Sequence, residues 1–203
     1  MMLPSRKRTY YGFDDGKGAA AVFVAAPGQA MAPLPLRCDI VNHSPTGFAW
    51  GYAGSGPVQL ALAILADYFG CTHAARALHQ LFKFAAISRI QEKHWSMTGS
   101  DIAHVIEKLC RDHPWLDRLA LFDDGPTMQI VDKYTEGYGE FGRLAAVVPH
   151  DESEANDELV LILNGSTEVT LYRDQVSARA DTQRNAVSGW CRQGPRCPEG
   201  KLA

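Results

Sequence analysis

The 203-residue sequence predicts an α+β fold, with a small N-terminal β-sheet, a core of three helices and a C-terminal antiparallel β-meander. Three observations lead to this prediction. Two β-prone runs open the chain, and residues 58–66 contain a single polar side chain, as in a helix that is buried on all sides. From residue 116 onward, the hydrophobic period changes from that of a helix to that of a strand.

The N-terminal sheet is predicted from residues 8–12 and 19–24, which flank a segment rich in aspartate and glycine. That composition is typical of a turn, so the two runs are expected to form a hairpin. A loop containing two prolines follows, and residues 34–40 are expected to be extended.

The central helix follows a loop at residues 47–57 that is rich in glycine and aromatic residues. Pro57 suits the first turn of a helix, where its missing N–H costs nothing, and the small residues before it can serve as the N-cap. We expect the rest of the chain to pack around the helix over residues 58–66. We also expect Trp50 or Tyr52 to be largely buried against a helix, because both carry a large apolar area.

Two further helices are predicted after the central one. Gly70 is a natural C-cap for the central helix, and Thr72 is a suitable N-cap for the next. A third helix is expected to begin near Thr98 or Ser100, with one buried stripe of apolar residues. It ends at His113, because a residue that precedes proline avoids the helical region.

The C-terminal meander is predicted from five β-prone runs, of which the last two are joined by Asn164-Gly165. This dipeptide favours the hairpin turn in which both central residues have positive φ. Residues from 177 onward lack a period and are predicted to be disordered. The expected domains are therefore residues 8–115, 116–176 and a tail at 177–203. The five expected strands are residues 118–122, 127–133, 143–148, 158–163 and 167–172.

The first half of the chain resembles a known family, over roughly residues 8–111. The family is an uncharacterised one, a domain of unknown function found in small bacterial, phage and mobile-element proteins. Because it has no established activity, the resemblance implies a mobile-element setting and assigns no catalytic residue. The motifs that carry it are Leu34-Pro35-Leu36-Arg37, His43-Ser44-Pro45-Thr46-Gly47-Phe48, Trp50-Gly51-Tyr52-Ala53-Gly54-Ser55-Gly56-Pro57, Phe82-Lys83-Phe84 and Trp95-Ser96-Met97-Thr98.

The loop before the central helix is one candidate ligand site. Its glycines lead into a helix N-terminus, where free N–H groups and the helix dipole favour an anion. It is not a phosphate-binding P-loop, because no Lys-Ser/Thr pair follows the last glycine. The alternative is that the glycines serve only tight packing of the loop. The candidate ligand-binding residues are Arg37, His43, Trp50, Tyr52, Gly54, Ser55 and Gly56.

No pattern in the sequence predicts a catalytic or metal site. Asp101, His104 and Glu107 are spaced three apart on the third predicted helix, as on any solvated helical face. The five cysteines are widely scattered, and Cys191 and Cys197 lack the second pair that a structural zinc site needs. We therefore expect no metal and no cofactor. No export signal or membrane-spanning run is visible, so we expect a cytoplasmic protein with reduced thiols and no membrane association.

Charge is strongly segregated along the chain. The formal net charge is -3, yet residues 117–175 contain 4 Lys or Arg against 13 Asp or Glu. The alternatives for this acidic region are a surface that keeps the protein soluble and a surface that binds a basic partner. The candidate partner-binding residues are Glu136, Glu140, Asp151, Glu152, Glu154, Asp157 and Glu158.

The sequence thus favours a non-enzymatic accessory protein of a mobile genetic element that acts by binding another protein. The expected partner is a basic protein, such as part of a nucleic-acid-processing or defence complex, which would give a counter-defence role. The chain's own net negative charge argues against direct binding of nucleic acid. The alternative is a small enzyme, or an anion-binding or nucleotide-binding domain, that uses the loop at residues 47–57.

Overall fold

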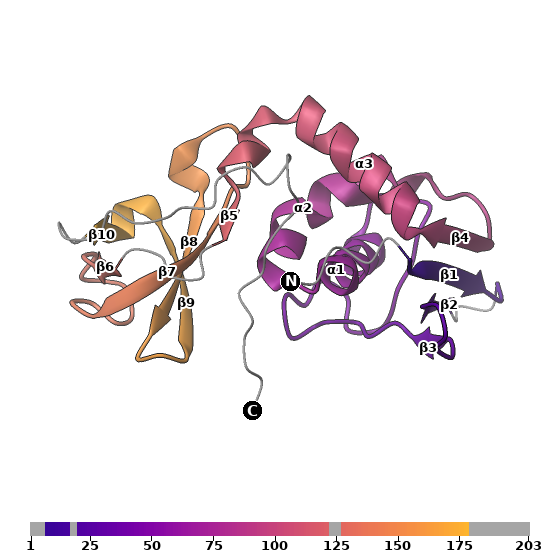
Figure 1. Ribbon diagram of the computed structural model, residues 1–203, viewed down its shortest axis with the longest axis horizontal. Helices are drawn as coiled ribbons and strands as arrows, with labels where there is room; N and C mark the ends of the chain where they lie inside the picture. The colour runs from indigo at the N-terminus through magenta and orange to yellow at the C-terminus, as the bar shows by residue number, and fades with distance from the viewer. Residues whose placement is uncertain (1–6, 17–19, 122–126, 179–203) are drawn as a thin grey trace. The chain divides into compact units, whose positions relative to one another are not determined.

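The computed structural model describes residues 7–16, 20–121 and 127–178, which form two compact units with a boundary between His113 and Pro114 (Figure 1). Each unit has its own antiparallel sheet, and the three α-helices of the described residues belong to the N-terminal unit. The α+β prediction, with an N-terminal sheet, three helices and a C-terminal meander, is confirmed. No helix in the described part of the chain is both long and apolar enough to cross a membrane.

The N-terminal sheet has four strands in the order β3-β2-β1-β4, all antiparallel. The predicted hairpin is present as β1 and β2, whereas β4 was not expected from the sequence. Strand β4 pairs with β1 in a register that places Trp95 opposite Gly12, and the indole occupies the space where a Cβ on Gly12 would lie. The strands are β1 (Thr9–Asp14), β2 (Ala20–Ala25), β3 (Ala32–Pro33) and β4 (His94–Thr98).

Helix α1 (Ser55–Phe69) lies at the centre of the N-terminal unit, as its apolar sequence predicts. It ends at Gly70, which adopts the left-handed conformation of a C-cap at φ 59°. Its N-cap is Gly54, so the helix begins one or two residues earlier than expected. At its far end, Asp67 accepts hydrogen bonds from Tyr10 of β1, at 2.7 Å, and from Arg8, which fastens the sheet to the helix.

Helices α2 (Thr72–Ala85) and α3 (Gly99–Asp112) complete the N-terminal unit beside the sheet (Figure 1). A short 3-10 helix, η1 (Ile87–Arg89), follows α2. Thr98 caps α3 through a reciprocal capping box with Asp101, whose carboxylate accepts from the Thr98 backbone N–H at 2.8 Å. The Thr98 hydroxyl hydrogen bond is the main reason that the pKa of Asp101 lies below its ordinary value. Asp101 is thus a helix cap.

The C-terminal unit is one antiparallel sheet in the order β10-β6-β7-β8-β9, with β5 paired to β7. The predicted turn is confirmed, because Asn164 and Gly165 have φ values of 50° and 81°. Strand β8 is buried on both of its faces, so its unbroken apolar run is explained. The strands are β5 (Ala120–Leu121), β6 (Thr127–Ile130), β7 (Phe141–Val148), β8 (Glu158–Leu163), β9 (Thr167–Tyr172) and β10 (Val176–Ala178).

Two of the predicted strands are shorter than expected. The chain forms the 3-10 helix η2 (Pro114–Arg118) before β5, and β6 ends three residues before the predicted limit at 133. Two further 3-10 helices, η3 (Glu154–Asn156) and η4 (Arg173–Gln175), connect the later strands. Strand β10 extends into the residues expected to be a disordered tail, and the rest of that tail, 179–203, lies outside the described residues.

Candidate functional site

The glycines of the loop at residues 47–57 allow close backbone packing. Gly51 has a φ of 82° and donates its N–H to the carbonyl of Ile87 at 3.1 Å, which ties the loop to η1. A Cβ on Gly51 would lie 2.7 Å from the carbonyl oxygen of Ile90, and one on Gly56 would lie 2.7 Å from the Cβ of Ala49. These contacts account for the glycines without a bound anion.

The two aromatic residues of the loop differ in their surroundings. Trp50 is half-buried, donates its indole N–H to the Glu92 carbonyl at 3.0 Å, and meets Trp95 edge to face with ring centroids 5.5 Å apart. Tyr52 is 53% exposed. Tyr52 therefore faces solvent and does not meet the expectation of a ring largely buried against a helix, whereas Trp50 is half-buried and contacts Trp95 of strand β4. The tryptophan pair is a contact between two segments that are distant in sequence.

Arg37 and His43, two of the candidate ligand-binding residues, have separate partners. Arg37 makes a two-pronged interaction with Asp39, at 3.0 and 3.1 Å, and this guanidinium lowers the pKa of the Asp39 carboxyl. The His43 ring instead contacts His79 of α2, with their Nε2 atoms 3.1 Å apart. The positive charge of Arg37 is thus compensated locally, and His43 belongs to a different group of side chains. Ser55 is exposed at the start of α1.

The position of His43 depends on the one polar side chain within the apolar part of α1. Gln59 is fully buried, and its Oε1 accepts from the backbone N–H of His43 at 2.8 Å and of Ser44 at 3.1 Å. Its Nε2 donates to the Leu36 carbonyl at 2.6 Å. Gln59 therefore satisfies its own hydrogen-bonding groups and fixes two points of the preceding loop.

The acidic candidates of the C-terminal unit include one residue that is structural. Asp157 is fully buried, and its carboxylate oxygens lie 3.1 Å from the guanidinium of Arg118 and 3.2 Å from that of Arg173. A buried carboxylate between two arginines holds three segments together and offers no charge to a partner. The expectation that Asp157 lies on an exposed acidic surface is therefore wrong.

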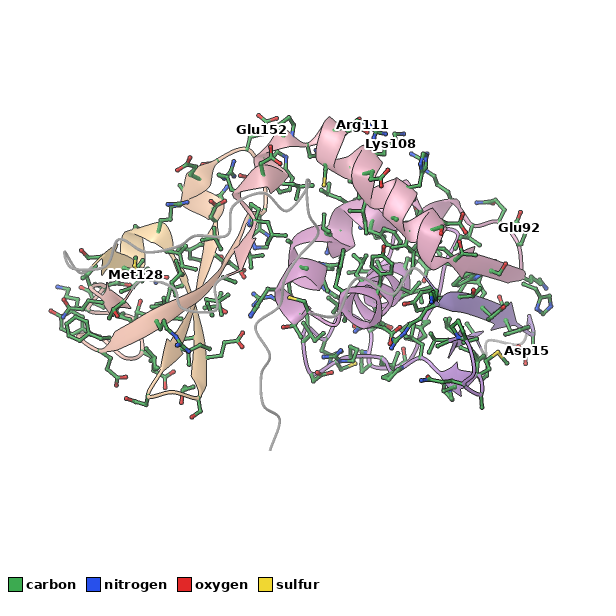
Figure 2. All side chains as sticks on the ribbon, viewed as in Figure 1. Asp15, Glu92, Lys108, Arg111, Met128 and Glu152 are labelled. Atoms are coloured by element: carbon green, nitrogen blue, oxygen red, sulfur yellow. The ribbon has the colours of Figure 1, made fainter. Side chains whose placement is uncertain are left out.

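The neighbouring acids are divided between local pairing and exposure. Asp151 is exposed, but its carboxylate accepts from the side chain of Asn156 at 2.6 Å, and this hydrogen bond is the main reason for its lowered pKa. Glu158 pairs with His150 at 3.2 Å. Glu154 is exposed and lies 4.0 Å from the guanidinium of Arg173. Glu152 is exposed, and Figure 2 shows it at the surface of its unit.

A second set of exposed residues occupies the loop between β6 and β7 together with the first residue of β7, and we call this segment the acidic–aromatic loop (residues 131–141). Tyr134 and Tyr138 are 86% and 61% exposed, and Phe141 at the end of the loop is exposed as well. The two glutamates between these rings, Glu136 and Glu140, are also exposed. Such a group of large exposed side chains marks a candidate interaction surface.

The acidic–aromatic loop is held in shape by its own hydrogen bonds. The Asp132 carboxylate accepts from the hydroxyl of Thr135 at 2.6 Å, which is the main reason that the pKa of Asp132 is lowered. The side-chain amide of Gln175 donates to the Thr135 hydroxyl at 2.8 Å. The backbone carbonyl of Gln175 accepts from the backbone N–H of Val131, also at 2.8 Å. Gly137 turns the chain with a φ of 81°. The aromatic rings thus project from an ordered loop.

The glutamates of this loop were predicted from the sequence as partner-binding residues, whereas its aromatic residues were not. The preceding strand was expected to run to residue 133, which left the tyrosines beside a strand end with no assigned role. One feature of the sequence could have indicated these exposed rings. Residues 134–141 contain three aromatic residues separated by glycine, threonine and glutamate, a pattern without the strand alternation that would bury them.

Comparison with known protein families gives one match. A family model described as a family of unknown function (DUF6166) matches residues 12–108, which contain most of the N-terminal unit and none of the acidic–aromatic loop. No curated protein and no solved structure matches the chain. The family match confirms the resemblance noted in the sequence. Residues 12–108 are thus similar to the DUF6166 family of unknown function.

Proposed function

We propose that this protein is a non-enzymatic accessory protein that acts by binding another protein through its C-terminal unit. The observation that carries the proposal is the set of exposed aromatic side chains on the acidic–aromatic loop. The partner is a basic protein, such as a component of a nucleic-acid-processing or defence complex in the cytoplasm. The mobile-element setting and the counter-defence role rest on the sequence resemblance alone.

Aromatic side chains are suited to anchoring a partner. Tyr134 and Tyr138 each offer a large ring with few rotatable bonds, and tyrosine is enriched among the residues that dominate binding energy. The hydrogen bonds of Asp132 and Gln175 already order the loop, so little conformational entropy remains to be lost on binding. Truncating one such anchor typically costs about 2 kcal/mol of binding free energy.

The charge of the loop indicates which partner fits. Glu136 and Glu140 stand between the exposed rings, and tyrosine faces attract cations. Lys133 of the loop already places its Nζ 4.9 Å from the centroid of the Tyr134 ring. An arginine of a partner can take the same kind of position and pair with a glutamate at once. The partner surface is therefore rich in arginine or lysine.

The proposal is tested with a short arginine-rich peptide and a DNA oligonucleotide, each labelled with a fluorophore and titrated by anisotropy. The wild-type protein should bind the peptide, more weakly as salt increases, and should not bind the DNA. The Tyr134→Ser, Tyr138→Ser double variant should lose at least about tenfold in peptide affinity. Tyr52→Ser is the matched control, since Tyr52 is an exposed tyrosine of the other unit.

Two results would overturn the proposal. Equal peptide binding by the double variant and the wild type would show that the loop is not the contact surface. Binding of the DNA in preference to the peptide would show that the partner class is wrong. Far-ultraviolet circular dichroism of each variant checks that the fold is unchanged.

A further inference from the structure

A group of four polar side chains in the N-terminal unit is rich in hydrogen-bond donors. It runs from His43 through His79 and Gln80 to Lys83, and the last three lie on α2. Its members are linked in series: His43 and Gln80 both contact Nε2 of His79, and Lys83 contacts Gln80. This group is separate from the acidic–aromatic loop, so a ligand of this group would be independent of the proposed partner binding.

The tautomers of the two histidines follow from their contacts. Nδ1 of His79 lies 2.7 Å from the Arg76 carbonyl, which can only accept, so Nδ1 carries the proton and Nε2 of the neutral ring carries a lone pair. Nε2 of His43, at 3.1 Å from that lone pair, must then be a donor. The Gln80 amide approaches the same atom at 3.4 Å. One acceptor atom thus faces two donors.

Lys83 adds a buried positive charge to the group. The residue is 7% exposed, its Nζ donates to the Gln80 side-chain oxygen at 3.1 Å, and it lies 3.7 Å from the centroid of the Phe84 ring. Among the residues that the structure describes, no carboxylate contacts His43, Gln80 or Lys83. An ammonium has three N–H donors, so this one retains capacity beyond its bond to Gln80.

The electrostatics agree with the geometry. Burial lowers the pKa of Lys83. Burial also lowers the pKa of His43, and the positive charge of Lys83 lowers it further. Both shifts express the cost of placing positive charge in a partly dehydrated site. Because none of the described carboxylates contacts Lys83, a negatively charged acceptor would offset the charge of its ammonium.

We propose that Lys83 and His43, whose ring is held by His79, form a binding site for a small oxyanion, such as inorganic phosphate or the carboxylate of a small organic acid. An anion oxygen accepts from the Lys83 ammonium, and its charge offsets that of Lys83. The same negative charge favours protonation of His43, whose Nδ1 then carries a second N–H. This site shares His43 with the ligand site first considered before α1, but its positive charge comes from Lys83 of α2 and not from a helix N-terminus. A metal ion fits less well, because the ammonium repels a cation and the described residues contain no group of three metal-ligating side chains.

The test titrates the full-length protein with sodium phosphate, sodium acetate and, as a salt control, sodium chloride. The readouts are the imidazole nitrogen resonances of His43 and His79 and the thermal midpoint. Saturable resonance shifts and a rising midpoint are expected with phosphate or acetate but not with chloride, and the more effective anion identifies the ligand class. A dissociation constant on the order of 1 mM suits a site with few hydrogen bonds.

Substitutions make the test specific. Lys83→Met keeps much of the apolar stem and should weaken anion binding by about tenfold or more, as expected for loss of a charge-assisted hydrogen bond. Without anion, this variant should melt at or above the wild-type midpoint, because a buried charge is removed. His43→Gln is a second variant, should Lys83→Met not fold. Lys108→Met is the matched control, because Lys108 is exposed on α3 (Figure 2).

Three results would overturn the proposal. Shifts that follow ionic strength equally for chloride and phosphate would indicate screening alone. Unchanged anion affinity in both Lys83→Met and His43→Gln would place any anion elsewhere. Stoichiometric shifts with zinc chloride and none with phosphate or acetate would make the histidine pair a metal site.

Discussion

Replacing Asp157 with asparagine should destabilise the C-terminal unit far more than replacing any neighbouring acid. The Asp157 side chain is 0% exposed, whereas those of Arg118 and Arg173 are 20% and 43% exposed. Breaking a buried ion pair by removing one partner costs about 3–5 kcal/mol, because a buried charge is left uncompensated. Here the arginines are partly hydrated, so we expect about 3 kcal/mol, the lower end of that range.

A loss of this size is easily measured by thermal unfolding. For a domain of about 60–100 residues, 1 kcal/mol shifts the midpoint by about 4–8 °C, so Asp157→Asn should lower the midpoint of the C-terminal unit by about 12 °C or more. Glu152→Gln is the control within the same loop and should change the stability by less than about 0.5 kcal/mol. A fall of less than about 1 kcal/mol in Asp157→Asn would refute the structural role of this ion-pair cluster. It would also show that Asp157 contributes no more to stability than the exposed acids of the same unit.

Two further substitutions test the N-terminal unit. Gly12→Ala should destabilise the N-terminal unit by about 1–3 kcal/mol, because the new Cβ meets the Trp95 indole. An unchanged thermal midpoint together with unchanged tryptophan fluorescence would show that the ring moves away freely. Thr98→Ala should cost about 1 kcal/mol at neutral pH through loss of the α3 cap. Since the Asp101 pKa is lowered in the fold, its contribution is present above the unfolded pKa and is lost as the pH falls through the folded pKa. The difference between Thr98→Ala and the wild type, followed by thermal midpoint against pH, should therefore shrink in acid; a constant difference would contradict the capping role.

The helices and the C-terminal strands were predictable because their signals are local. The apolar run of α1, its C-cap at Gly70 and the Asn164-Gly165 turn each depend on residues that are adjacent in the chain. Strand β4 was not predictable in this way. It has only five residues and lies next to a helix cap, and its partner β1 is more than 80 residues earlier in the chain.

Asp157, whose role was predicted wrongly, and His79, which was not predicted, share one physical reason, which is that their partners are distant in sequence. Asp157 lies within an acidic run, and nothing local separates it from its neighbours, because Arg118 is 39 residues away. His79 is one of several polar residues of α2, and nothing local marks it as buried, because His43 is 36 residues away. Composition indicates the acidity of the C-terminal unit, but only the tertiary structure separates acids that bind arginine within the chain from acids that face solvent.

That separation changes the kind of binding that the acidic region can support. Asp157 is buried between Arg118 and Arg173, so fewer exposed charges remain than the sequence suggests. Charge at a surface acts mainly on the rate of association and is screened by salt, whereas buried aromatic anchors act mainly on the rate of dissociation. If Tyr134 and Tyr138 are the anchors, added salt should slow association of a basic partner and leave dissociation nearly unchanged. The double tyrosine variant should do the reverse, with faster dissociation and a nearly normal association rate.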